Sequence, residues 1–169
     1  MRKYEIVALD GVDRTGKTTI AENLENQYGW LNINAHLFLD VTNCPRMMRV
    51  WSDPPIMSVI KKAELTNVVL DRSIISSMSY NHDLPYYEMA YSTLKEFFKW
   101  YSLGVFYVWF TFYDVKTIMK RDPGISEEQV AYDNNSFKKV YDDLGVDPLI
   151  VYAEDSIGYN LKAILNESL

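Results

Sequence analysis

The 169-residue sequence predicts an α/β domain in which helices cover both faces of a central parallel sheet of about five strands. Short apolar runs rich in β-forming residues recur along the chain, and longer segments with helical spacing lie between them. The runs are nearly continuous rather than alternating, which is typical of strands buried on both faces in a parallel sheet. We therefore expect ligands beyond the carboxyl ends of these strands.

The expected strands are YEIVAL (4–9), WLNIN (30–34, the weakest), NVVLD (67–71), VFYVWFTF (105–112) and LIVYAE (149–154). Helical spacing follows the first strand and recurs over 86–102 and 126–144, where Ser126 and the acids after it are typical of a helix start. Segment 35–57 contains expected turns at 43–45 and 53–55, with room for a short helix between them. Its role stays open.

The composition, with 48% hydrophobic and 24% charged residues, indicates one globular domain over residues 1–169. The net charge of −6 argues against nucleic-acid and membrane-surface partners, because both need a basic face. The sequence has neither a signal-peptide pattern at its start nor an apolar run of about 18 residues. The single cysteine, Cys44, fits a reducing compartment. We expect a cytoplasmic protein.

The strongest functional signal is a glycine-rich loop between the first strand and the first helix. Residues 9–20 read LDGVDRTGKTTI and contain the pattern Gly-x-x-x-x-Gly-Lys-Thr. The two glycines let the backbone N–H groups turn toward phosphate oxygens, and the helix start adds partial positive charge. Lys17 can then reach the β- and γ-phosphates of ATP, and the Thr18 hydroxyl can bind Mg²⁺. The expected nucleotide-binding residues are Gly11, Asp13, Arg14, Thr15, Gly16, Lys17, Thr18 and Thr19.

A second polar pair, Asp71 and Arg72, ends the apolar run at 67–71. In a fold with this loop, that strand end faces the phosphates. The Asp71 carboxylate can therefore hold Mg²⁺ or take a proton from an attacking hydroxyl, and Arg72 can clamp a second phosphate. Alternatively, the pair forms an ion pair or caps a helix together with Ser73. The residues alone leave both interpretations open.

Both stretches resemble thymidylate kinases. DGVDRTGKTT (10–19) is similar to their phosphate-binding loop, and DRSIISSMSY (71–80) is similar to the segment at the end of their third strand. Residues 121–144 resemble, more loosely, their lid and the helix after it, which places a lid at about 120–128. The resemblance implies a three-layer P-loop kinase fold, transfer of the γ-phosphoryl of Mg²⁺-ATP to a deoxynucleoside monophosphate, and a homodimer.

The resemblance also implies roles for single residues. Asp13 would contact the 3′-hydroxyl of the acceptor sugar, Arg14 would reach the γ-phosphate, and Arg72 would hold the acceptor phosphate. Ser77 would lie near the acceptor base, and Tyr80 would lie under the deoxyribose. The alternatives are an Asx turn for Asp13, a solvent-exposed side chain for Arg14, and helix packing for Ser77 and Tyr80.

The expected catalytic set is Lys17, Arg14, Asp71 and Arg121, with Thr18 and Asp71 as the metal ligands. Lys120 and Arg121 are the cations of the lid segment, and their alternative is an ordinary solvated helix end.

Some residues depart from the thymidylate kinase pattern. No Arg-Glu-Pro-Gly segment follows the second strand, although Arg46 or Arg49 could replace its arginine, and Ser73 gives the Asp-Arg-Ser form typical of deoxynucleoside kinases. A deoxynucleoside kinase is therefore the nearest alternative function. A non-kinase nucleotide-binding module or ATPase is the second, although the Asn-Lys-x-Asp guanine reader of GTP switches does not occur.

Overall fold

The computed structural model describes residues 5–34, 55–80 and 87–168. In chain order, the elements are β1 (Ile6–Gly11), α1 (Lys17–Tyr28), β2 (Leu31–Asn34), β3 (Val68–Asp71), α3 (Ile74–Tyr80), α4 (Tyr87–Tyr101), β4 (Val105–Thr111), α5 (Val115–Arg121), α6 (Glu127–Leu144), β5 (Leu149–Tyr152) and α7 (Ile157–Ser168). Residues 55–62 are also helical. The turns expected at 43–45 and 53–55, with Cys44, Arg46 and Arg49, lie wholly or partly outside the described residues.

The five strands form one sheet in the order β2-β3-β1-β4-β5, and each neighbouring pair is parallel. The predicted α/β class and parallel sheet are thus confirmed. The first strand extends further than predicted, because Asp10 and Gly11 still pair with Trp109 and Phe110 of β4.

Side chains of β1 alternate between two hydrophobic clusters, one on each face of the sheet. Ile6 and Ala8 pack with residues of α3, α4 and α6, whereas Val7 and Leu9 pack with residues of α1 and α7. All four are at most 3% exposed, which explains why the run is continuously apolar.

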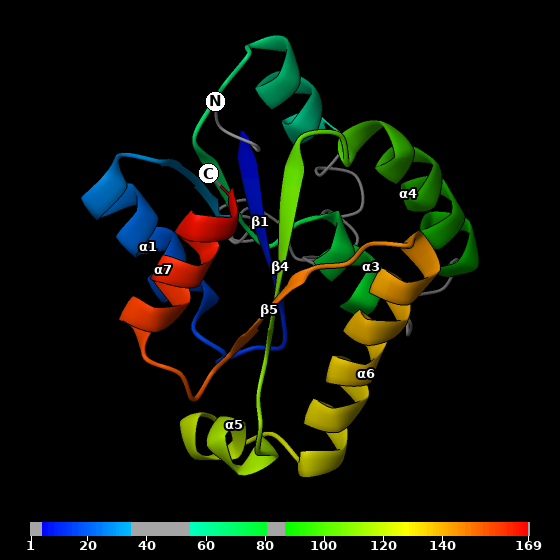
Figure 1. Ribbon diagram of the computed structural model, residues 1–169. Coiled ribbons are helices and arrows are strands. Elements are labelled where there is room, and N and C mark those ends of the chain that lie inside the picture. Colours follow the sequence, from blue (N-terminus) through cyan, green and yellow to red (C-terminus); the bar gives the residue numbers. More distant parts are fainter. Residues whose placement is uncertain (1–4, 35–54, 81–86, 169) are drawn as a thin grey trace.

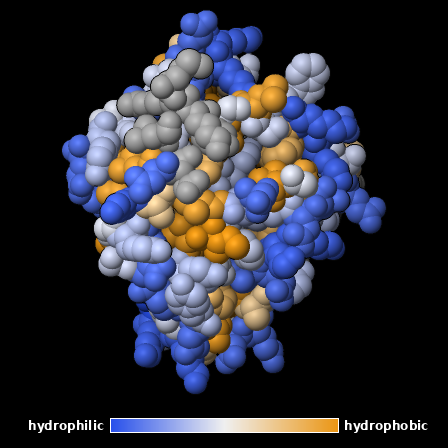
Figure 2. All heavy atoms as spheres, viewed as in Figure 1, coloured by the Kyte–Doolittle hydropathy of each residue, from blue (hydrophilic) through white to orange (hydrophobic). Residues whose placement is uncertain are grey.

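Figure 1 shows the resulting three layers, with α1 and α7 on one side of the sheet and α3, α4 and α6 on the other. Helix α5 lies beyond the carboxyl end of β4, below the sheet in this view. Figure 2 shows apolar residues gathered over β4 and the edge strand β5, between helices whose surfaces are mostly hydrophilic. Over the described ranges, no helix combines the length and apolar character needed to cross a bilayer.

Candidate active site

The glycine-rich loop connects β1 to α1 at the carboxyl edge of the sheet. Gly11 has φ 135°, and a Cβ atom placed there would lie 2.0 Å from the carbonyl oxygen of Phe110 in β4. No side chain fits at that distance, so this position requires glycine. Gly16 has φ 99° and precedes α1, where it offers no side chain to cap the helix. The first backbone N–H groups of α1 are thus left without a capping side chain, and the first residues of this helix line the cavity beside the loop.

Lys17 is held inside this loop. Its side chain is buried, and its Nζ donates to the carbonyl oxygen of Val12 at 2.5 Å and to Oγ1 of Thr15 at 3.2 Å. The Thr15 hydroxyl in turn donates to the same carbonyl at 2.8 Å. These bonds orient the Lys17 ammonium within the loop.

Thr18 and Asp71 meet although they lie 53 positions apart in the sequence. The Thr18 hydroxyl donates to Oδ2 of Asp71 at 2.7 Å. Asp71 is 1% exposed, and its Oδ1 is buried without a hydrogen-bond partner among the described residues. A buried carboxylate oxygen left in this state is costly unless a cation or water satisfies it.

These two residues fit a Mg²⁺ ion. Magnesium prefers oxygen ligands, and it usually takes one or two protein oxygens together with waters and substrate phosphates. The described residues contain no cluster of three or more acidic, histidine or cysteine side chains that could hold a metal. A hydroxyl and one carboxylate beside a cavity match the magnesium pattern rather than that of an all-protein metal cage.

Arg72 follows β3 and bends back over the end of β1. Its guanidinium pairs with Oδ1 of Asp13, donates to the carbonyl oxygen of Gly11 at 3.4 Å, and lies 5.3 Å from the centre of the Tyr80 ring. The Arg72 side chain is 4% exposed, whereas that of Asp13 is 61% exposed. Arg72 has φ 80°, a left-handed conformation that is strained for any residue but glycine.

Arg14 and Arg121 meet at the tip of the loop. Arg121, the last residue of α5, donates from one nitrogen to the carbonyl oxygen of Arg14 and from another to that of Ala153, both at 2.8 Å. Nε of Arg14 lies 3.5 Å from Oδ2 of Asp122, and the Arg14 side chain is 60% exposed. Arg121 therefore connects the loop tip to the segment after β5. The Arg14 side chain is mostly exposed to solvent.

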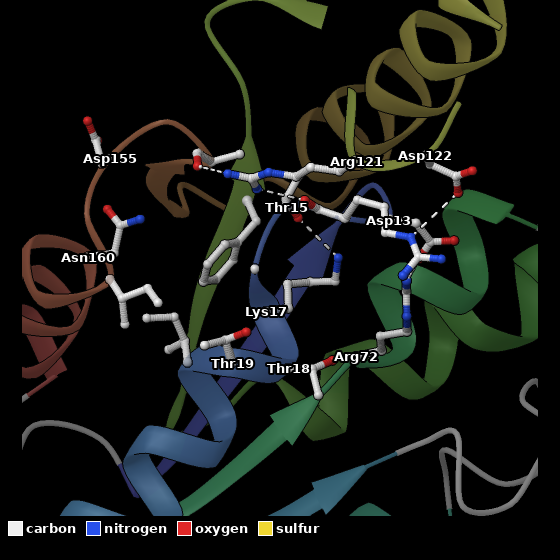
Figure 3. A pocket seen from close by; sticks show the side chains of 16 residues that line it. Asp13, Thr15, Lys17, Thr18, Thr19, Arg72, Arg121, Asp122, Asp155 and Asn160 are labelled. Atoms are coloured by element: carbon white, nitrogen blue, oxygen red, sulfur yellow. Dashed lines mark hydrogen bonds and ion pairs between the residues drawn. The ribbon is translucent and has the colours of Figure 1, made fainter. Parts of the chain in front are cut away.

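These residues surround a cavity of about 720 Å³. Its lining includes the loop from Asp13 to Ile20, together with Arg72, Phe110, Arg121, Asp122, Ala153, Asp155, Ile157 and Asn160. In Figure 3, Lys17 lies at its centre, Arg72 extends from one side toward Asp13, and Arg121 spans the top. Four basic residues line the cavity, against three acidic ones, in a chain of net charge −6. The cavity is therefore suited to an anion.

The two remaining predicted residues belong to α3. Ser77 is 1% exposed and is not among the residues that line this cavity. The Tyr80 hydroxyl donates to the carbonyl oxygen of Gly11 at 3.3 Å, and its ring packs edge-on against Phe137 at 5.1 Å. The Tyr80 hydroxyl therefore holds the turn from β1 into the loop, and the Tyr80 ring lies beside the Arg72 guanidinium.

Sequence reasoning missed several polar residues of this region. Asp122, Asp155 and Asn160 line the cavity, and Asp10 is fully buried at the end of β1. A sequence signal existed only for Asp10, because an acid that ends a buried apolar run needs an explanation, as Asp71 does. Asp122 and Asp155 lie in connections between elements, and Asn160 lies in the first turn of α7. The order of the strands decides which of these segments lie close to the glycine-rich loop.

Comparison with known proteins identifies the fold. No protein-family model and no curated protein sequence matches the chain. Among solved structures, the YorR protein of Bacillus subtilis in complex with phosphorylated GDP is similar with a TM-score of 0.68 and 18% identity, over 96% of this chain and 94% of that one. Deoxyadenosine kinase from M. mycoides with bound dATP has a TM-score of 0.63 and 17% identity, over 96% and 98%.

Thymidylate kinase from Candida albicans has a TM-score of 0.61 and 14% identity, over 99% of this chain and 92% of that chain. At such identities the likeness concerns the fold. The resemblance inferred from the two motifs is thus confirmed at that level: the chain has the three-layer α/β fold that these deoxynucleoside and nucleotide kinases share.

Proposed function

We propose that this protein is a phosphotransferase that moves the γ-phosphoryl group of Mg²⁺-ATP to a deoxynucleoside monophosphate. One observation carries the proposal: the glycine-rich loop with Lys17 and a second cation, Arg72, line the same cavity. An arginine in this place can clamp the phosphate of an acceptor through two hydrogen bonds. Its kinase neighbours share the fold, which agrees with a transferase.

The donor lies along the loop in this proposal. Backbone N–H groups at the start of α1 and the Lys17 ammonium hold its phosphates. Thr18 and Asp71 hold Mg²⁺, which neutralises charge on the β- and γ-phosphates when it is bound. Arg14 reaches the γ-phosphate from the loop tip, and Arg121 fixes that tip through the Arg14 carbonyl.

The acceptor lies on the side of Arg72. Its phosphate oxygen forms a bond to the γ-phosphorus while the bond from that phosphorus to the bridging oxygen of ADP breaks. A phosphate monoester is mostly doubly ionised at neutral pH, so this acceptor needs no general base. Positioning and charge neutralisation are then the main tasks of the protein, and the four basic residues that line the cavity can serve them.

A deoxynucleoside kinase is the second candidate, favoured by Ser73. The structure offers another reason for that serine, because its hydroxyl donates to the buried Asp10 carboxylate at 2.6 Å. Ser73 is therefore explained by packing of the β3–α3 junction, whichever acceptor is used. A hydroxyl acceptor would also need a base, and Asp71 is already bonded to Thr18.

A panel assay tests the proposal. The protein is incubated with Mg²⁺-ATP and, separately, each deoxynucleoside and each deoxynucleoside monophosphate, and products are separated by ion-exchange chromatography. We expect diphosphate formation from at least one monophosphate, and none from Lys17→Ala or in EDTA. Faster turnover of a free deoxynucleoside would reverse the acceptor assignment. ADP release that is equal with and without acceptors would instead indicate an ATPase.

A further inference from the structure

Asp10 is a fully buried carboxylate that the proposed mechanism does not use. It lies one residue before Gly11 in β1 and is 0% exposed. Its Oδ1 accepts from the backbone N–H of Ser73 at 2.9 Å, from the backbone N–H of Ser76 at 3.1 Å and from the Ser76 hydroxyl at 2.6 Å. Its Oδ2 accepts from the Ser73 hydroxyl at 2.6 Å. Four hydrogen bonds thus join one side chain of β1 to the start of α3.

The bonded residues directly follow Arg72. The backbone N–H of Arg72 itself donates to the carbonyl oxygen of Leu9 in β1 at 3.0 Å. Arg72 is therefore bound to β1 through its own backbone and, one residue later, through Asp10. These bonds hold the chain where Arg72 adopts φ 80°, a conformation that persists only when its surroundings impose it.

A carboxylate suits this position for a chemical reason. All four partners donate, and an ionised carboxylate is the side chain that accepts at both oxygens and donates nothing. Its negative charge also lies at the first turn of α3, where the helix dipole favours it. Burial raises the pKa of both Tyr107 and Tyr141, and the Asp10 charge raises each further. These phenols therefore stay neutral beside it.

We propose that Asp10 is a positioning residue of the acceptor site: through Ser73 and Ser76 it fixes the backbone of Arg72, so that the guanidinium is directed toward the cavity. The inference rests on the proposed function, and specifically on Arg72 binding the phosphate of the acceptor. Loss of the Asp10 contacts would leave the donor loop in place but let Arg72 relax out of its strained conformation. Acceptor binding would weaken, while ATP binding would not.

Ser76→Ala tests this with a matched control. It removes one hydroxyl bond to Asp10, whereas Ser79→Ala removes a buried hydroxyl of the same helix that bonds the Ile75 carbonyl oxygen instead. Both should lower the melting temperature by similar amounts. Only Ser76→Ala should raise the KM of the monophosphate, by about three- to tenfold, with the KM of ATP unchanged. Asp10→Asn should show the same selectivity with a larger effect.

A double-mutant cycle asks whether Asp10 acts through Arg72. In the Arg72→Ala background, Ser76→Ala should add little to the KM of the monophosphate, because the positioned group is already gone. Additive effects would overturn the inference, as would equal behaviour of Ser76→Ala and Ser79→Ala in the wild-type background. If the wild-type protein phosphorylates no monophosphate, the proposed function fails instead, so the two failures are distinguishable.

Discussion

At the scale of single residues, Arg14 and Arg121 have different surroundings and should have different tasks. The Arg14 side chain is 60% exposed and pairs with the half-buried carboxylate of Asp122, whereas both terminal nitrogens of Arg121 donate to carbonyl oxygens. We expect Arg14→Ala to lower kcat by about 10³-fold, because a cation on the γ-phosphate stabilises charge that builds up during transfer.

Arg121→Ala should mainly raise the KM of ATP, since its bonds hold the loop tip and the connection after β5. Arg14→Lys should restore only part of the lost rate, because a point charge lacks the planar fork of a guanidinium. Steady-state kinetics with saturating acceptor separates these effects. If Arg121→Ala lowers kcat more than Arg14→Ala does, the catalytic cation belongs to the lid instead.

Asp71 provides a metal-dependent prediction. Asp71→Asn should lower kcat by roughly a hundredfold and raise the Mg²⁺ concentration needed for half-maximal activity, because an amide oxygen binds a hard cation less well than a carboxylate does. Titrating Mg²⁺ at fixed ATP measures this, and Thr18→Ala should shift the same curve. If Asp71 serves only to fix the Thr18 hydroxyl, Asp71→Asn will lower the melting temperature while the Mg²⁺ titration stays as in wild type.

At the scale of elements, the start of α6 is set by its capping residue. Ser126 Oγ accepts from the backbone N–H of Gln129 at 3.1 Å, and Glu127 and Glu128 occupy the first turn. Ser126→Ala should destabilise the protein by about 1 kcal/mol, and Ser126→Asp should keep most of the stability. Urea unfolding at neutral pH measures both. Equal stability of the alanine variant and the wild type would show that this helix end does not depend on the cap.

Helices α4 and α6 are joined by a pH-sensitive contact. Lys95 donates to both oxygens of Asp143, at 2.9 and 2.8 Å, and the Tyr91 hydroxyl donates to Oδ2 at 2.8 Å. These bonds hold the pKa of Asp143 below its ordinary value. A carboxyl whose native pKa is lowered stabilises the fold fully above the unfolded pKa, and that contribution is lost as the pH falls through the native value.

The stability difference between wild type and Asp143→Asn should therefore be present at neutral pH and shrink as the pH falls below about 4. Glu96→Gln is the control, because Glu96 pairs with Lys99 within the same helix, α4. A difference that persists unchanged into acid would show that the Asp143 charge is not what connects the helices.

At the scale of the whole molecule, nucleotide binding should stabilise the fold. The cavity is lined by residues that follow β1, β3 and β5, so a bound nucleotide contacts several elements at once. Mg²⁺-ATP at about a hundred times its Kd adds about 2.7 kcal/mol, which raises the melting temperature by about 5 to 10 °C for a chain of this size. Lys17→Ala should lose most of this shift, whereas Lys62→Ala, exposed on the 55–62 helix, should keep it.

Much of the fold was predictable because its causes are local. All five apolar runs became strands, and β1, β3 and β4 are largely buried on both faces because the sheet lies between two helix layers. The loop at 11–19 was predictable for a similar reason, because its glycines and the helix that follows are neighbours in the sequence. The boundary of β1 was placed too early, because Gly11 reads as a loop residue until its pairing with Phe110 is known.

The sequence by itself thus determined the strands, the glycine-rich loop and the polar pair at the end of β3. Only the tertiary structure decided which distant residues meet. Asp10 and Ser76 are 66 positions apart, Asp13 and Arg72 are 59 apart, and Arg121 and Arg14 are 107 apart. The order β2-β3-β1-β4-β5 brings them together, and no apolar run encodes that order. Contacts between strand ends follow from how whole strands pair, so the roles of Asp10, Asp122 and Arg121 emerge only in the folded chain.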